Sequence, residues 1–211
     1  MTNFLRTLYT AGAVAIALGS MPAMGQTQFA EVTPPQVPAA MQVPAGNTAF
    51  LKGQATGTQN YICMPTATGF GWKFTGPQAT LFISFNWING EVKQQITTHY
   101  LSPNPMEAGT PRATWLSSLD TSAVWAKAIV TSTDTNYVAP GAIPWLLLQI
   151  VGSQTGPTGG DMLKPTSYIQ RVNTAGGVMP AAGCTEESNV GATAFVPYTT
   201  DYYFFKSSRR F

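Results

Sequence analysis

The chain contains a single histidine, His99, and any acid–base chemistry at neutral pH would start from it. Histidine is the side chain whose ordinary pKa lies closest to 7, so it is the usual general acid or base. His99 ends a run of strand-forming residues and precedes an irregular, proline-containing segment, a common position for functional residues. Two interpretations stay open: a reactive histidine, or a histidine that is hydrogen-bonded at the margin of a sheet.

The acidic residues that could orient such a histidine are few. Asp120 and Asp201 both stand beside aromatic residues, where loss of solvent would raise the pKa of a carboxyl group. In a hydrolase or an isomerase, His99 would act as acid and base, and Asp120 or Asp201 would orient its ring. The alternative for each aspartate is a structural role, closing a turn or pairing with a cation such as Arg171.

The aromatic content favours binding over catalysis. The chain has five tryptophans and eight tyrosines but only 9% charged residues. Aromatic rings provide stacking surfaces for sugars and apolar molecules, although most are expected in the core. The polar or amphipathic residues His99, Trp115, Asp120 and Arg171 are our candidate ligand-binding residues. We therefore expect a non-catalytic domain that binds a carbohydrate, a small apolar ligand or a surface partner.

Missing motifs exclude several enzyme classes. The chain has no phosphate-binding G-x-x-x-x-G-K-[ST] loop and no G-x-S-x-G nucleophile elbow. Residues 69–74 begin like a dinucleotide fingerprint, but Phe74 replaces the third glycine. A nucleotide- or NAD-dependent enzyme is therefore excluded, and we expect neither a cofactor nor a metal site. The formal net charge of +2 gives no basic surface for a nucleic acid partner.

The first 25 residues are typical of a secretory signal peptide. Arg6 precedes the short apolar run 11–19, and Ala23-Met24-Gly25 places small residues at a cleavage site. The apolar run is shorter than the ~20 residues of a transmembrane helix. We expect export to the periplasm or the cell exterior, with no membrane span in the mature chain.

Export also determines how the two cysteines are interpreted. An oxidising compartment favours a disulfide between Cys63 and Cys184. Two buried free thiols are the alternative, and a zinc site would need His99 and a carboxylate as further ligands.

The rest of the sequence indicates short strands separated by turns. Residues 26–47 are proline-rich and predict an extended arm, residues 48–205 a single β-domain, and residues 206–211 a basic tail. Glycine and proline recur between runs rich in β-branched and aromatic residues. The predicted strands are 49–55, 59–64, 79–87, 92–100, 123–132, 143–151, 167–173 and 194–205. Few or no helices are expected, so the fold class is an antiparallel β-sandwich or a compact β-barrel.

Two local patterns are more specific. Asn89-Gly90 between strand-like runs predicts a β-hairpin, since both residues tolerate positive φ. Residues 143–151 are apolar on both alternating faces, which predicts a central strand buried on two sides.

A third functional hypothesis is an envelope or matrix subunit. In that case the proline-rich arm would pair with a neighbouring copy and drive self-association.

Several stretches together resemble a family of secreted bacterial and fungal proteins, the domain-of-unknown-function 3455 family. The most distinctive stretch is Ile-Gln-Arg-Val-Asn-Thr-Ala-Gly-Gly at 169–177, and others are 59–63, 72–74, 143–148 and 196–204. The resemblance covers nearly all of the chain after residue 47 and implies secretion and a single domain, but no reaction. The family joins the His99-Tyr100 pair to Trp115 by a very short link, whereas residues 101–113 intervene here. We expect this insertion to reshape or cover a shared site near His99.

Overall fold

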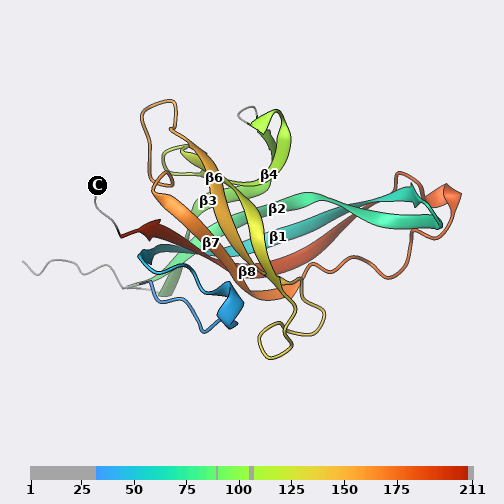
Figure 1. Ribbon diagram of the computed structural model, residues 1–211, viewed down its shortest axis with the longest axis horizontal. Coiled ribbons are helices and arrows are strands. Elements are labelled where there is room, and N and C mark those ends of the chain that lie inside the picture. Colours follow the sequence, from blue (N-terminus) through green and yellow to red (C-terminus); the bar gives the residue numbers. More distant parts are fainter. Residues whose placement is uncertain (1–31, 89, 105–106, 209–211) are drawn as a thin grey trace, which may run out of the picture. The chain divides into compact units, whose positions relative to one another are not determined.

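Eight antiparallel strands form a closed barrel (Figure 1). The computed structural model describes residues 32–208 except residues 89 and 105–106, so the predicted signal peptide, residues 26–31 of the arm and the last three residues of the tail lie outside the described part. The strands follow one another in chain order, and the last returns to pair with the first. They are β1 (Asn47–Thr66), β2 (Gly69–Trp87), β3 (Gly90–Asn104), β4 (Thr110–Ser117), β5 (Ala123–Ser132), β6 (Trp145–Gln154), β7 (Thr166–Gly176) and β8 (Thr193–Ser207). The all-β antiparallel prediction is confirmed, and of its two alternatives the chain forms the barrel.

Helical structure is confined to single turns in the described residues. The 3₁₀ turn η1 (Ala39–Met41) lies in the arm, and η3 (Glu187–Asn189) lies between β7 and β8. Within the described ranges, no helix has the length and apolar character needed to cross a membrane.

The prediction of separate strands at 49–55 and 59–64 is wrong, because β1 runs through both without interruption. Gly57 between them is not a turn residue. A Cβ atom at Gly57 would lie 2.1 Å from the carbonyl oxygen of Gln78 and 2.6 Å from the Cβ of Ala79. The glycine is thus required because β2 lies very close to β1 at this point.

Strand β4 was not among the predicted strands. It pairs with the end of β3, with Leu101 opposite Ala113 and His99 opposite Trp115. The insertion 101–113 therefore lengthens a β-hairpin by adding residues to both of its strands. The β2–β3 hairpin is confirmed, but Gly90 is the first residue of β3, opposite Trp87.

Strand β6 is buried on both faces at its start, as the sequence predicts. Leu148 belongs to the cluster inside the barrel, while Trp145 belongs to a second cluster on its outer side. The inner cluster contains the large side chains Leu81, Ile96, Trp115, Val124, Ile169, Tyr198, Tyr202 and Phe204. The barrel thus has a filled core on one side of the sheet and a covered patch on the other.

The arm provides that cover. Met41 is 0% exposed and packs in the outer cluster with Trp145, Val172 and Tyr203. Gln170 Nε2 donates a hydrogen bond of 2.8 Å to the carbonyl oxygen of Met41. The described part of the arm therefore lies on the barrel of its own chain, and its apolar side chains are buried there.

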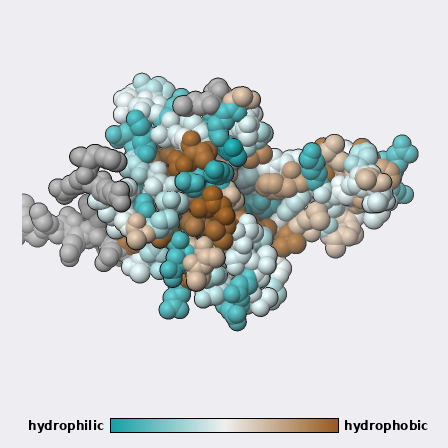
Figure 2. All heavy atoms as spheres, in the orientation of Figure 1, coloured by the Kyte–Doolittle hydropathy of each residue, from teal (hydrophilic) through white to brown (hydrophobic). Residues whose placement is uncertain are grey.

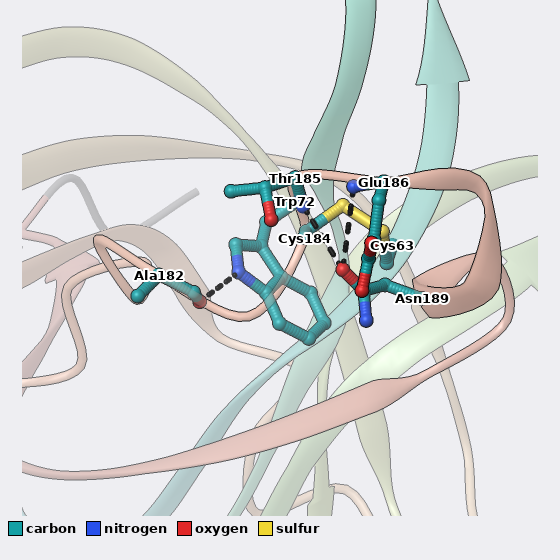
Figure 3. Close-up of a disulfide and its surroundings, with 7 residues drawn as sticks. All are labelled: Cys63, Trp72, Ala182, Cys184, Thr185, Glu186 and Asn189. Atoms are coloured by element: carbon teal, nitrogen blue, oxygen red, sulfur yellow. Dashed lines mark hydrogen bonds between the residues drawn. A yellow bond between two sulfur atoms is a disulfide. The ribbon is translucent and has the colours of Figure 1, made fainter.

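Strands β1, β2 and β8 project beyond the other strands as a three-stranded extension (Figure 1). A disulfide joins Cys63 of β1 to Cys184 in the connection between β7 and β8, which confirms the predicted pairing (Figure 3). Trp72 Nε1 donates to the carbonyl oxygen of Ala182, 2.9 Å away, in the same connection. These contacts hold the β7–β8 connection against the extension.

The visible surface differs between the two regions. In Figure 2, the most hydrophobic residues gather on the barrel, whereas the extension shows a mixture of polar and weakly apolar residues. On the face shown in Figure 2, no continuous apolar surface runs along the extension.

Candidate functional site in the barrel interior

A cavity of about 320 Å³ opens inside the barrel. Its buried lining residues form the floor: Gln59, Pro77, His99, Trp115, Ala126, Leu148 and Tyr202. Phe74, Leu101, Pro111, Lys127 and Ala128 are exposed and mark the mouth. Arg112, Ala113, Leu146 and Arg171, of intermediate exposure, complete the wall. The volume lies at the lower end of the range of small-molecule pockets.

The strand ladders explain why the polar floor residues meet. His99 and Trp115 are opposite each other in the β3–β4 pair, and Arg171 and Tyr202 are opposite each other in the β7–β8 pair. Side chains alternate across a strand, so directly opposed residues point to the same face of the sheet. Closure of the barrel then brings the two pairs together across its interior.

His99 is enclosed by aromatic rings. Its ring stacks on Trp115 with 4.2 Å between centroids and meets the edge of Tyr202 at 5.2 Å. Its Nδ1 lies 2.9 Å from the carbonyl oxygen of Thr114, which can only accept, so Nδ1 carries the hydrogen. Burial lowers the pKa of His99 to about 3, outweighing the hydrogen bond to Thr114 that favours the charged form. The ring is therefore neutral at pH 7.

Arg171 places a positive charge in the cavity wall. Its Nη2 donates to the carbonyl oxygen of Pro144 at 2.8 Å, while Nε is buried and has no hydrogen-bond partner of standard geometry. The ion pairs within the described residues are Lys52–Asp201 and Arg112–Glu107. Arg171 thus has no carboxylate partner in the part of the chain that the structure describes, and no acidic residue lines the cavity.

Three other buried polar atoms of the lining also lack hydrogen bonds of standard geometry: Gln59 Nε2, Trp115 Nε1 and the Tyr202 hydroxyl. The Tyr202 hydroxyl interacts with Tyr198 and Arg171, and the Tyr198 hydroxyl also interacts with Gln59. Burial raises the pKa of both tyrosine hydroxyls. Both tyrosines therefore stay protonated and able to donate.

The insertion contributes one side of the cavity. Leu101, Pro111 and Ala113 line it, and Arg112 beside them makes a forked pair with Glu107 through Nε and Nη2. The insertion therefore builds a wall at the mouth and leaves the cavity open.

Of the four predicted ligand-binding residues, the structure brings His99, Trp115 and Arg171 together and places Asp120 elsewhere. Asp120 Oδ2 accepts from the backbone N–H of Met162 at 2.8 Å, and Oδ1 accepts from the hydroxyl of Ser122 at 2.7 Å. Desolvation raises the pKa of Asp120, but these hydrogen bonds outweigh it and hold the pKa at about 2. Asp120 thus joins two loops as a permanent carboxylate.

Asp201 also lies apart from His99. It pairs with Lys52 at 3.0 Å and accepts from Asn173 Nδ2 at 2.9 Å. In the described residues, neither aspartate orients the histidine, whose ring is held by a backbone carbonyl. The same residues contain no group of three or more His, Cys, Asp or Glu side chains that could hold a metal ion.

Sequence reasoning missed Gln59 and Tyr202. The available signal was the alternation of Tyr198, Tyr202 and Phe204 in the last predicted strand, which places all three on one face. That this face is the barrel interior follows only from the closure.

The comparison with family models covers the whole site. A model described as "Protein of unknown function (DUF3455)" matches residues 44–206, from just before β1 to the penultimate residue of β8. The chain belongs to the DUF3455 family. No curated protein and no solved structure matches it. Every residue of the cavity lies in the matched region of this DUF3455 protein, and the resemblance seen in its sequence is confirmed.

Proposed function

We propose that this protein is an exported, non-catalytic binding protein that holds a small apolar ligand in the barrel cavity. The observation that carries the proposal is the cavity of about 320 Å³, whose lining combines apolar side chains such as Leu146, Leu148 and Ala126 with a few polar groups. Mostly apolar walls with a small number of placed polar groups are typical of small-molecule sites.

The tryptophans favour an interior ligand over a carbohydrate stacked on the surface. Trp115, Trp125 and Trp145 are 0%, 4% and 4% exposed, so none of these three offers a ring to a surface-bound sugar. Trp115 can still contact a ligand inside the barrel, because it lines the cavity.

The state of His99 favours binding over acid–base catalysis. A base whose conjugate acid has a pKa of about 3 is a poor proton acceptor at pH 7 and does not supply a proton there. Neither Asp120 nor Asp201 takes the orienting position that a catalytic pair would need.

Two features support export. The leader-like pattern of residues 1–25 is that of a secretory signal peptide. The Cys63–Cys184 disulfide is the kind of bond that persists in an oxidising compartment.

The test uses the uncharged fluorescent dye N-phenyl-1-naphthylamine, whose emission rises in apolar surroundings. We expect saturable binding to the wild-type protein and at least a tenfold weaker affinity for Ala126→Leu, which fills the cavity. Ala139→Leu, at an exposed position, is the matched control and should bind as the wild type does. Circular dichroism verifies that each variant is folded, and Ala113→Leu replaces Ala126→Leu if that variant is not. Equal dye affinity in a folded cavity variant would contradict the proposal.

A further inference from the structure

We infer that the ligand of this cavity carries a carboxylate group and that Arg171 binds it. The inference rests on the proposed binding function and adds the chemical class of the ligand. It starts from the buried polar atoms of the cavity that make no hydrogen bond of standard geometry within the protein.

These atoms are donors. Arg171 Nε, Gln59 Nε2 and Trp115 Nε1 can only donate hydrogen bonds, and the Tyr202 hydroxyl remains protonated and can donate as well. Arg171 interacts with the Tyr202 hydroxyl, and Gln59 with the Tyr198 hydroxyl, but neither contact has standard hydrogen-bond geometry. Buried polar groups in native proteins nearly always have well-formed hydrogen bonds, and an incompletely paired donor is costly. A ligand group that accepts several hydrogen bonds would satisfy this set, whereas a donor group would not.

The charges of the lining point in the same direction. Three cations, Arg112, Lys127 and Arg171, line the cavity, and no aspartate or glutamate does. Arg112 is neutralised by Glu107 at 3.0 Å, and Lys127 is exposed at the mouth. Arg171 has no carboxylate partner among the described residues, and an unpaired charge next to a buried aromatic floor is unfavourable. An anion supplied by the ligand would remove this cost.

The guanidinium of Arg171 is already positioned. The bond from Nη2 to the carbonyl oxygen of Pro144 fixes one side of the group. The guanidinium also interacts with the Tyr202 hydroxyl, and its Nε makes no hydrogen bond of standard geometry. Tyr202, its neighbour in the β7–β8 ladder, lines the cavity beside it. Because the donors are ordered before binding, little conformational entropy is lost when an anion arrives. Guanidinium groups bind carboxylates through charge-assisted hydrogen bonds.

The walls limit the remainder of the ligand. Leu101, Ala126, Leu146 and Leu148 are apolar, and the cavity volume is about 320 Å³. A ligand that suits both parts has one carboxylate beside Arg171 and a short apolar tail against the apolar side chains.

Two probes with the same tail provide the test. Octanoate and 1-octanol compete with N-phenyl-1-naphthylamine for the wild-type protein, and the concentrations that displace half of the dye are compared at pH 7.5. We expect octanoate to displace the dye at a concentration about tenfold or more lower, since a hydrogen bond to a charged group contributes an effect of this size. In Arg171→Gln this preference should disappear while 1-octanol competes as before. Lys164→Gln removes an exposed cation that does not line the cavity and should preserve the preference.

The outcomes separate the two proposals. If the dye binds but octanoate and 1-octanol compete equally in the wild type, the carboxylate inference is overturned and the binding function stands. If the dye and both competitors fail to bind, both are overturned. Persistence of the preference in Arg171→Gln would also overturn the assignment of Arg171. Because the main comparison uses the wild-type protein, it remains decisive if that variant does not fold, and Tyr202→Phe then serves as the second variant, with a reduced preference expected.

Discussion

The ring of His99 shows how its surroundings decide the chemistry of a single residue. The only histidine of the chain is packed against Trp115 and Tyr202 and held by the carbonyl oxygen of Thr114. Burial makes protonation of this ring costly, and the nearby positive charge of Arg171 adds to the cost. The residue that the sequence marks as the best acid–base candidate is therefore a neutral ring in the lining of the cavity.

We predict that His99 does not titrate between pH 8 and pH 5 in the folded protein. The nitrogen chemical shifts of the ring should show a hydrogen on Nδ1 throughout, and assignment is direct because the chain has one histidine. The folded-state pKa is about 3 and the ordinary unfolded value is about 6.5, so above pH 6.5 neither state binds the proton. A titration midpoint near 6.5 would show that the ring is solvated.

The same shift makes the stability of the protein depend on pH. Between pH 6.5 and pH 3 the unfolded state binds a proton that the folded state excludes. The free energy of unfolding then falls with falling pH by up to about 1.4 kcal/mol per pH unit. Urea unfolding of the wild type and His99→Gln should reveal this slope in the wild type alone, on top of the contribution of carboxyl groups common to both.

At the scale of elements, the arm acts as a cover for the barrel. Residues 32–46 contain the three-residue turn η1. Its Met41 packs in the outer hydrophobic cluster with side chains of β5, β6, β7 and β8. Without this segment, the apolar outer patch around Trp145 and Val172 would face water. In the described part of the arm, Val32, Val37 and Val43 pack in the same cluster of their own chain.

We predict that Met41→Ala lowers the free energy of unfolding by about 2–5 kcal/mol, since it removes a fully buried side chain and leaves a cavity. Met64→Ala is the matched control, because Met64 on β1 is 39% exposed and its loss should change stability by less than about 0.5 kcal/mol. Urea unfolding followed by tryptophan fluorescence measures both. Equal effects in the two variants would show that the arm does not pack on the barrel in solution.

For the molecule as a whole, the disulfide lies away from the buried residues of the cavity. Most of the cavity lining lies in the barrel, and Phe74 of the extension reaches its mouth. The bond between Cys63 and Cys184 ties the β7–β8 connection to the extension. The disulfide closes a long segment, with a sequence separation of 121, and so restricts the unfolded chain strongly. We therefore expect that removal of the disulfide lowers the stability of the protein and leaves the cavity intact.

We predict that the double variant Cys63→Ala/Cys184→Ala loses about 2–4 kcal/mol of unfolding free energy and keeps its dye affinity within about twofold of the wild type. Urea unfolding and dye titration test the two halves of this statement. A large loss of dye affinity in the folded double variant would show that the extension shapes the cavity.

The sequence by itself determined the features that depend on local chemistry. Alternation of apolar residues and recurring Gly, Pro and Asn predict strands and hairpins, because side-chain direction and turn conformation depend on near neighbours. The pairing of Cys63 with Cys184 followed from the number of cysteines and the leader. The turn predicted at Gly57 is wrong, since a glycine that permits close strand approach has the same sequence pattern as one in a turn.

Only the tertiary structure decided what the barrel interior contains. His99, Trp115, Arg171 and Tyr202 come from four strands and meet because β8 closes on β1. No local pattern records that closure, and none distinguishes Asp120, engaged by Met162 and Ser122, from a residue of the site. Whether a polar side chain is a free donor or a satisfied one depends on partners far away in the chain, and these are fixed only when the strands assemble.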